Sequence, residues 1–221
     1  MAAPGKHVLT YWPIRGLGAP CRIAFTLAGL PFDDAHPDRA VFFGPNPMRE
    51  ANPMLNLPCV TLPNGRIIVQ SGAIFRYIAR LGNLYGASDE DRCRVDEVLE
   101  HLVDLNREKS VMTYDKENHA SHKADFLTKS IPYYFGTLEG FIAKNGTSFA
   151  AANELTIADV VLYEHSSAVL ALFGEDALAA YPLVMRTVLA VKNHPKLAAY
   201  HTQAAATPFN GFAGAWGAMK I

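Results

Sequence analysis

The sequence predicts an α/β domain followed by an all-helical domain. In the first eighty or so residues, patterns with the period of two typical of strands alternate with the longer period typical of helices. From Ser88 onward only helical periodicity remains. We therefore place an α/β domain at residues 1–84 and an all-helical domain at residues 88–221.

The first strand and the first helix are separated by a glycine-containing turn. His7 to Trp12 has the pattern of a strand, and Pro20 to Ala28 then has helical spacing. Proline is common in the first turn of a helix, and Gly29 is placed to cap the end of this one. A second strand with fewer apolar residues is predicted at Phe32 to His36. The resulting order is strand, helix, strand.

A crossover and a hairpin are predicted next. Residues 42–55 are rich in Pro and Asn, which favours an irregular segment with about one helical turn. Residues 58–69 have the pattern of a β-hairpin with an Asn-Gly tip. Pro58 at its start removes one donor from the strand ladder. A mixed sheet follows from this order of elements.

The hairpin leads directly into a helix. Gln70-Ser71-Gly72 precedes the apolar-periodic segment 73–80, and Ser71 is a natural N-cap. The first backbone N–H groups of a helix have no acceptor inside the helix and can bind an anion. We expect this helix start to bind a small charged ligand.

The second domain contains clear helix signals. Ser88 is the expected N-cap of a first long helix, and Pro132 is expected to kink a second. Thr156 and Asp159 form a capping box before Val160 to Phe173, which is apolar almost all round and is therefore expected at the centre of the domain. Two more helices are predicted around residues 178–191 and 195–206.

Composition and charge exclude several classes of function. The formal net charge of −1 gives no electrostatic case for binding nucleic acid or an anionic membrane. No apolar run approaches the length of a membrane-spanning helix, and the first residues lack an apolar signal core. The three cysteines have no zinc-type spacing, and their odd number argues against a disulfide framework. We expect a cytoplasmic protein.

Four segments together resemble the cytosolic glutathione S-transferases, and the resemblance covers essentially the whole chain. The segments are Tyr11 to Leu17, Asn56 to Pro58, Gln70 to Arg80, and the capping box at Asp159. The first is most similar to the mu class, with elements of the sigma class. The resemblance implies a thioredoxin-like first domain and a cis peptide bond before the proline of the second segment. It also implies glutathione as co-substrate, with no permanently bound cofactor.

The resemblance implies that Tyr11 is the catalytic residue. A thiol of cysteine type has a pKa of about 8.5, whereas a phenol with a pKa of about 10 stays protonated and can donate a hydrogen bond to sulfur. A hydrogen bond to a charged acceptor contributes about 1.5–3 kcal/mol, which lowers the pKa of the thiol by about one to two units. Spacing alone favours a strand aromatic packed in the core, and the surrounding motif reverses this preference.

Other residues are assigned to glutathione by the same resemblance. Gln70 and Ser71 would bind the γ-glutamyl carboxylate, and the backbone of Leu57 would pair with the cysteinyl amide. Arg49 would bind the glycyl carboxylate, with an ordinary solvated arginine as the alternative. Four more residues lie near glutathione according to the resemblance: Trp12, Leu17, Asn56 and Pro58. For the tryptophan, a buried aromatic beside a strand is the alternative.

The helical domain contributes the remaining candidates. Asp104 matches a position that reaches across a dimer to the α-amino group of glutathione, so the resemblance implies a homodimer; a solvated aspartate is the alternative. Tyr114 matches a position that lines the electrophile pocket. Phe209, with Phe212 and Trp216, could close that pocket or dock on the helical domain.

Three functions are compatible with this pattern. We expect conjugation of glutathione to hydrophobic electrophiles, a detoxification activity. One alternative is a sigma-like, glutathione-dependent isomerase of prostaglandin type, although Leu17 stands where such enzymes carry an arginine. The other is a non-catalytic ligand carrier or lens crystallin. No metal site is predicted, because His119 and His122 lack a third ligand.

Overall fold

The structure, a computed structural model, describes residues 5–210. Its sheet is mixed and has the strand order β2-β1-β3-β4. Strands β1 and β2 are parallel, whereas β3 is antiparallel to both β1 and β4. The strands are β1 (His7–Thr10), β2 (Phe32–Ala35), β3 (Cys59–Thr61) and β4 (Ile67–Val69). The strand–helix–strand unit and the hairpin predicted from the sequence are confirmed.

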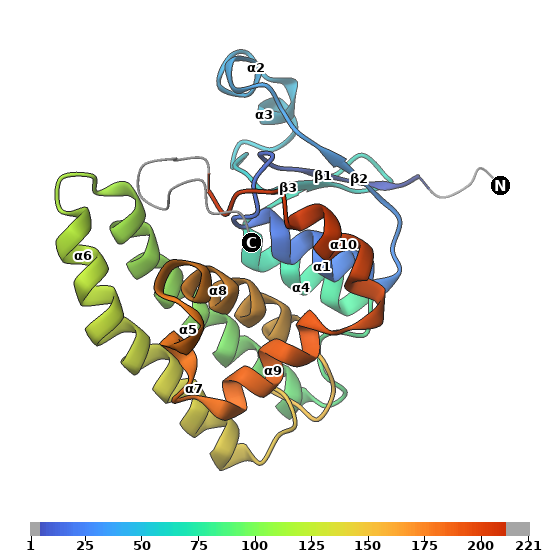
Figure 1. Cartoon of the computed structure of the whole chain (residues 1–221). Helices are drawn as coiled ribbons and strands as arrows, with labels where there is room; N and C mark the ends of the chain where they lie inside the picture. The colour runs from blue at the N-terminus through green and yellow to red at the C-terminus, as the bar shows by residue number, and fades with distance from the viewer. Residues whose placement is uncertain (1–4, 211–221) are drawn as a thin grey trace.

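Helices α1 (Gly18–Ala28) and α4 (Ser71–Leu81) pack against each other. They lie on the face of the sheet that is turned toward the helical domain (Figure 1). Gly29 caps α1 in the left-handed conformation, with φ 65°, as expected for a helix-ending glycine. The peptide bond between Leu57 and Pro58 is cis, as the family resemblance implied.

The crossover is more regular than the sequence predicted. Instead of one helical turn, it contains two short helices, α2 (Arg39–Phe43) and α3 (Pro47–Ala51), beyond the opposite side of the sheet (Figure 1). Asp38 and Asn46 cap them: the Asp38 side chain accepts from two backbone N–H groups of the first turn of α2, and the Asn46 side chain accepts from one of α3. Local caps therefore give this segment helical structure despite its Pro and Asn content.

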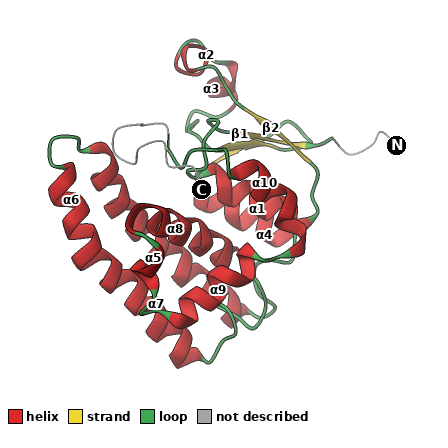
Figure 2. Ribbon diagram, in the orientation of Figure 1, coloured by secondary structure: helices red, strands yellow, loops and turns green. Residues whose placement is uncertain are grey.

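Helices account for the regular structure of the second domain within the described residues (Figure 2). The long helices are α5 (Asp89–Tyr114), α7 (Ile131–Asn145), α8 (Ile157–Phe173) and α9 (Pro182–Lys192). Shorter helices are α6 (His119–Asp125) and α10 (Ala198–Ala204). Short 3-10 turns lie at Glu175–Leu178 and Pro195–Leu197. The fold class predicted from the sequence is confirmed.

The irregularity predicted at Pro132 takes the form of a π-helical turn, Phe126–Ser130, between α6 and α7. Proline lacks a backbone N–H, and its ring collides with the carbonyl four residues earlier in a regular α-helix. Pro132 lies in the first turn of α7, a position where proline is tolerated, and the π turn ends two residues before it.

Helix α8 is the buried centre of the helical domain, as predicted. It contacts α5, α9 and α1, so it connects the two domains. Its capping box is formed: the backbone N–H and the hydroxyl of Thr156 donate to Asp159 Oδ2 at 2.6 and 2.8 Å. The backbone N–H of Ala150 donates to the other carboxylate oxygen at 2.8 Å. Burial raises the pKa of Asp159 to about 6, against these hydrogen bonds.

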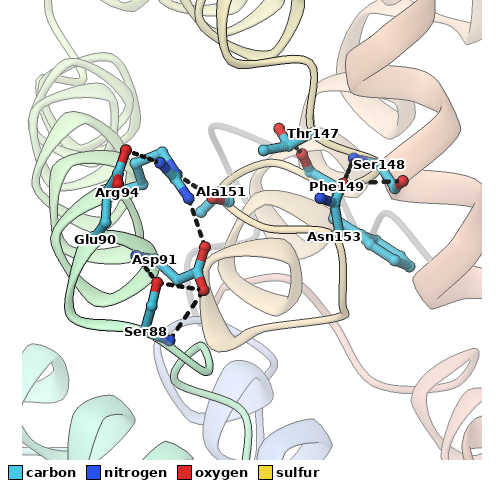
Figure 3. Close-up of polar contacts among 9 residues, drawn as sticks. All are labelled: Ser88, Glu90, Asp91, Arg94, Thr147, Ser148, Phe149, Ala151 and Asn153. Atoms are coloured by element: carbon cyan, nitrogen blue, oxygen red, sulfur yellow. Dashed lines mark hydrogen bonds and ion pairs between the residues drawn. The ribbon is translucent and has the colours of Figure 1, made fainter.

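The start of α5 is also fixed by polar contacts (Figure 3). Ser88 and Asp91 form the predicted N-terminal cap, with the Asp91 N–H donating to Ser88 Oγ at 3.0 Å. Arg94 pairs with Asp91 and with Glu90, and its Nε donates to the backbone oxygen of Ala151 at 2.9 Å (Figure 3). The start of α5 is thus joined to the loop that precedes α8.

Candidate active site

Tyr11 follows β1, and its ring packs closely against the backbone of two glycines. Its N–H donates to the Ala35 oxygen at 3.0 Å, and its side chain is 7% exposed. A Cβ at Gly18 would lie 2.4 Å from ring atom Cδ1, and one at Gly16, where φ is +38°, would lie 2.6 Å from the phenol oxygen. The two glycines therefore provide the space that the tyrosine ring fills.

The phenol oxygen of Tyr11 has one fixed partner. The backbone N–H of Leu17 donates to it at 3.1 Å. Burial raises the pKa of Tyr11, and the Leu17 hydrogen bond only partly opposes this effect. The phenol is therefore neutral near pH 7, and its own O–H can donate to an anion. Because the oxygen already accepts from Leu17, that proton is directed to another acceptor.

A cavity of about 220 Å³ lies beside Tyr11, between the two domains. It brings together sequence-predicted residues from both parts of the chain. They are Tyr11, Leu17, Ser71, Tyr114 and Phe209. The tail residues Phe212 and Trp216 lie outside the described residues.

Helix α4 begins one residue earlier than the cap assignment required. Gln70, not Ser71, is the N-cap, and Ser71 is the first helical residue. Gln70 has φ 70° and ψ 113°, a conformation that non-glycine residues rarely adopt and that costs about 1–3 kcal/mol. Ser71 lies at the helix start and on the cavity wall, where the first N–H groups of α4 have no acceptor inside the helix.

Two predicted glutathione-binding residues lie near α2 and α3 instead of on the cavity wall. The Trp12 ring packs against Phe42 and Phe43, with centroid distances of 5.5 and 6.1 Å. The Arg49 guanidinium lies over the Phe42 ring at 5.4 Å and is exposed. Both side chains have packing partners without a ligand.

The segment before β3 holds three more candidates. Asn56 Oδ1 accepts the backbone N–H of Leu57 at 2.8 Å, and Pro58 is buried. A peptide that paired with Leu57 through this N–H would replace the Asn56 contact. These residues do not line the cavity, and neither does the exposed Gln70 side chain.

Asp104 and Tyr114 both belong to α5 but differ in position. Asp104 is about half exposed and pairs with Arg107, with 2.6 Å between Oδ1 and Nη1. Its neighbours Val103 and Asn106 line the cavity, whereas Asp104 does not. Tyr114 lies at the C-terminal end of the helix and lines the cavity. Within one chain, Asp104 is therefore not part of the site.

Sequence reasoning missed a buried ion pair beside the site. Arg15 is 1% exposed, and its Nε and Nη2 donate to the Glu164 carboxylate at 3.1 and 2.8 Å. Its guanidinium carbon lies 4.1 Å from the centre of the Phe209 ring. Burial would lower the pKa of Arg15, but the Glu164 carboxylate outweighs it and raises the pKa. Arg15 was visible in the first motif, but its partner is 149 residues away and has no sequence signal.

Comparison with known proteins decides the family. A profile of the glutathione S-transferase N-terminal domain matches residues 7–80, and one of the C-terminal domain matches residues 103–204. A glutathione S-transferase of Dirofilaria immitis is 31% identical over 210 residues, which are 93% of this chain and 98% of that protein. The chain belongs to the glutathione S-transferase family.

This glutathione S-transferase is also similar to a crystallin and to a solved structure. S-crystallin 4 of Enteroctopus dofleini is 27% identical, over 92% of this chain and 99% of the relative. The solved pi-class glutathione S-transferase of Onchocerca volvulus has a TM-score of 0.82 and 28% identity, over 93% of this chain and 98% of that one. The family predicted from the sequence is confirmed, whereas the likeness to mu and sigma classes is approximate.

The part of this transferase that the structure describes holds neither a metal-binding cluster nor a membrane-spanning helix. Among residues 5–210, no cluster of three or more His, Cys, Asp or Glu side chains is arranged to hold a metal ion. No helix in the same region has the length and apolar character needed to cross a membrane.

Proposed function

We propose that this glutathione S-transferase conjugates the glutathione thiolate, activated by Tyr11, to hydrophobic electrophiles. The observation that carries the proposal is a neutral, buried phenol on the wall of a cavity between the two domains. The Leu17 N–H fixes the phenol oxygen, so the O–H is free to point at a sulfur atom beside it. A donor held in place in this way stabilises a thiolate without reorganising.

In the proposed reaction, the first domain holds glutathione and the second holds the electrophile. The γ-glutamyl carboxylate binds at Gln70 and Ser71, where the start of α4 offers free N–H groups. The thiol gives its proton to solvent, and Tyr11 stabilises the thiolate by a hydrogen bond. Sulfur then forms a bond to an electrophilic carbon, and the leaving group departs with its electron pair.

Apolar side chains make up much of the electrophile side of the cavity. They include Phe75, Leu99, Leu102, Val161 and Phe209. A wall of this kind favours hydrophobic substrates.

The three cysteines are free, which supports a reducing, cytoplasmic location.

Two alternatives have less support. A carrier or crystallin-like protein has no need of a positioned donor, yet the Tyr11 phenol, its glycine-lined space and the cavity are all present. An isomerase of prostaglandin type is less supported because Leu17 contributes an aliphatic side chain to the cavity, at the position where such enzymes carry an arginine.

The wild-type protein is expected to conjugate glutathione to 1-chloro-2,4-dinitrobenzene with saturable kinetics in both substrates. Absorbance of the conjugate measures the rate, and the uncatalysed reaction at the same pH is the baseline. A rate no faster than that baseline, with glutathione bound, would favour the carrier function and contradict our proposal.

We also propose that the active unit is a homodimer in which Asp104 of one subunit reaches the ligand of the other. Asp104 is about half exposed and does not line its own cavity, so it is available for such a contact. We expect Asp104→Ala and Tyr11→Phe homodimers to be weakly active. In a refolded equimolar mixture, half of the dimers are hybrids, and each hybrid has one site with both residues intact.

Activity of the mixture should therefore rise to about a quarter of the wild-type value if the two residues of one site come from different subunits. If both come from the same chain, each site of a hybrid carries one substitution and no activity returns. Native mass spectrometry verifies that hybrids form. Hybrids without recovered activity, or a fully active Asp104→Ala homodimer, would remove Asp104 from the site.

A further inference from the structure

The cavity wall carries three charged side chains, and one of them lacks a counter-charge. They are Arg76 from α4, Lys109 from α5 and Glu164 from α8. Arg76 contacts two carboxylates of α5, each at 2.7 Å, and Glu164 is paired with Arg15. No carboxylate within residues 5–210 forms an ion pair with Lys109. Glu164 attracts the Lys109 charge without contacting it and is itself paired with Arg15, so the ammonium adds a positive charge to the cavity that no direct ion pair within residues 5–210 offsets.

Lys109 is held by one neutral partner. Its Nζ lies 2.9 Å from Nδ1 of His165, which is 6% exposed and also lines the cavity. Burial, together with the Lys109 charge, places the pKa of His165 well below its usual value. The imidazole is therefore neutral, and we assign its Nδ1 as the acceptor because an ammonium can only donate. The remaining N–H groups of Lys109 and the Nε2–H of His165 leave this end of the cavity rich in donors.

A partly buried ammonium without a direct ion pair is less stable than the same group in water, and the Glu164 charge offsets this only in part. Burial lowers the pKa of Lys109 to about 8, so most of the protein still carries this charge at pH 7. A ligand atom with negative charge would provide what the protein does not. Because Lys109 is only partly exposed, water screens such an interaction less than it would at the protein surface.

We propose that Lys109, positioned by His165, determines electrophile specificity and favours α,β-unsaturated carbonyl compounds, in which attack by sulfur places negative charge on oxygen. This inference rests on the proposed function. In the addition, the thiolate sulfur bonds to the β-carbon, and the C=C electron pair moves to the bond between the α-carbon and the carbonyl carbon. The carbonyl pair moves to oxygen, giving an enolate.

The Lys109 ammonium donates a hydrogen bond to the enolate oxygen. A proton from water then adds to the α-carbon, and the carbonyl re-forms. Sulfur and hydrogen have been added across the double bond, so no oxidant or reductant is needed. Because the negative oxygen exists only after attack begins, the contact is stronger in the transition state than in the bound substrate.

The test compares two electrophiles in the full-length protein. 2-Nonenal forms an enolate on attack, whereas benzyl chloride has no oxygen and releases chloride. The ratio of their kcat/KM values should fall about 10- to 100-fold in Lys109→Met, mainly through kcat for the aldehyde. Lys109→Arg keeps the charge and should retain part of the selectivity. Lys129→Met, which removes an exposed lysine paired with Asp125, should leave the ratio unchanged.

His165 is tested as a positioning residue by two substitutions. His165→Leu removes the acceptor for Lys109 and should lower the ratio, whereas His165→Gln keeps an acceptor and should restore part of it. Glutathione affinity, measured by calorimetry, should be unchanged in both variants and so shows that the first domain is intact.

The same ratio has a predicted pH dependence. In the wild type it should decline as the pH rises through about 8, where Lys109 loses its proton, and in Lys109→Met it should be flat. Ionisation of glutathione affects both substrates and cancels in the ratio. The other charged or titratable groups around the cavity are Tyr11, Arg15, Arg76, Tyr114, Glu164 and His165.

The outcomes separate the two claims. If the wild type is active toward both electrophiles and Lys109→Met has the same ratio of kcat/KM values as the wild type, the role of Lys109 is overturned. The proposed function then still stands. A wild type active toward 1-chloro-2,4-dinitrobenzene but not toward 2-nonenal overturns this inference alone. A wild type inactive toward all three electrophiles overturns the proposed function, and this inference with it. The inference is supported if the ratio falls in Lys109→Met and stays closer to the wild-type value in Lys109→Arg.

Discussion

Tyr11→Phe is expected to slow conjugation at pH 7 by about 10- to 100-fold. The substitution keeps the ring that fills the space beside Gly16 and Gly18 but removes the donor. Without that hydrogen bond, the pKa of the bound thiol rises by about one to two units, and the thiolate fraction at pH 7 falls accordingly. Raising the pH should recover much of the loss, because hydroxide then removes the proton. Initial rates between pH 6 and pH 9 measure both effects.

Tyr133→Phe is the matched control for this substitution. Tyr133 is exposed and packs edge-on against Tyr134, a contact that the phenylalanine ring keeps. Its rate profile should coincide with that of the wild type. A Tyr11→Phe enzyme with the wild-type rate at pH 7 would make Tyr11 a packing residue.

Glu164→Leu is expected to lower the free energy of unfolding by about 3–5 kcal/mol, because it leaves the Arg15 charge buried without a partner. Both side chains are nearly inaccessible, at 1% and 6% exposure, so water cannot replace the lost contact. The double variant Arg15→Met, Glu164→Leu removes both charges and should recover much of this loss. Urea denaturation of the three proteins measures the difference.

An exposed ion pair provides the comparison for this buried one. Asp33→Ala breaks the contact between Asp33 and Lys6, whose side chains are 60% and 59% exposed, respectively. It should lower the free energy of unfolding by at most about 1 kcal/mol. If Glu164→Leu were no more destabilising than Asp33→Ala, the buried pair would not stabilise the junction between the domains. Adding the Arg15→Met single variant completes a double-mutant cycle, which isolates the coupling between Arg15 and Glu164.

Much of the fold could be predicted because its signals are local. The cap at Ser88 and the capping box at Thr156 each depend on side chains three residues apart, which the sequence displays directly. Helices α2 and α3 were underestimated because each spans only five residues and has little apolar periodicity. Their caps, Asp38 and Asn46, were the available signal.

The candidate site was predictable in part for the same reason. Tyr11 and Ser71 belong to continuous motifs, and the structure places both on one cavity wall. The contacts of Glu164 with Arg15 and of His165 with Lys109 join residues 149 and 56 positions apart. Neither long-range contact has a periodic or motif signal, because each depends on how α8 packs against the loop after β1 and against α5.

The ionisation of bound glutathione reports directly on whether Tyr11 activates the thiol. Thiolate absorbance in the ultraviolet, titrated with glutathione bound to the protein, gives the pKa of the thiol. We expect a wild-type pKa about one to two units below the usual value of about 8.5, and a pKa near that usual value in Tyr11→Phe. Equal pKa values in the two proteins would contradict the assignment of Tyr11 as the group that activates the thiol.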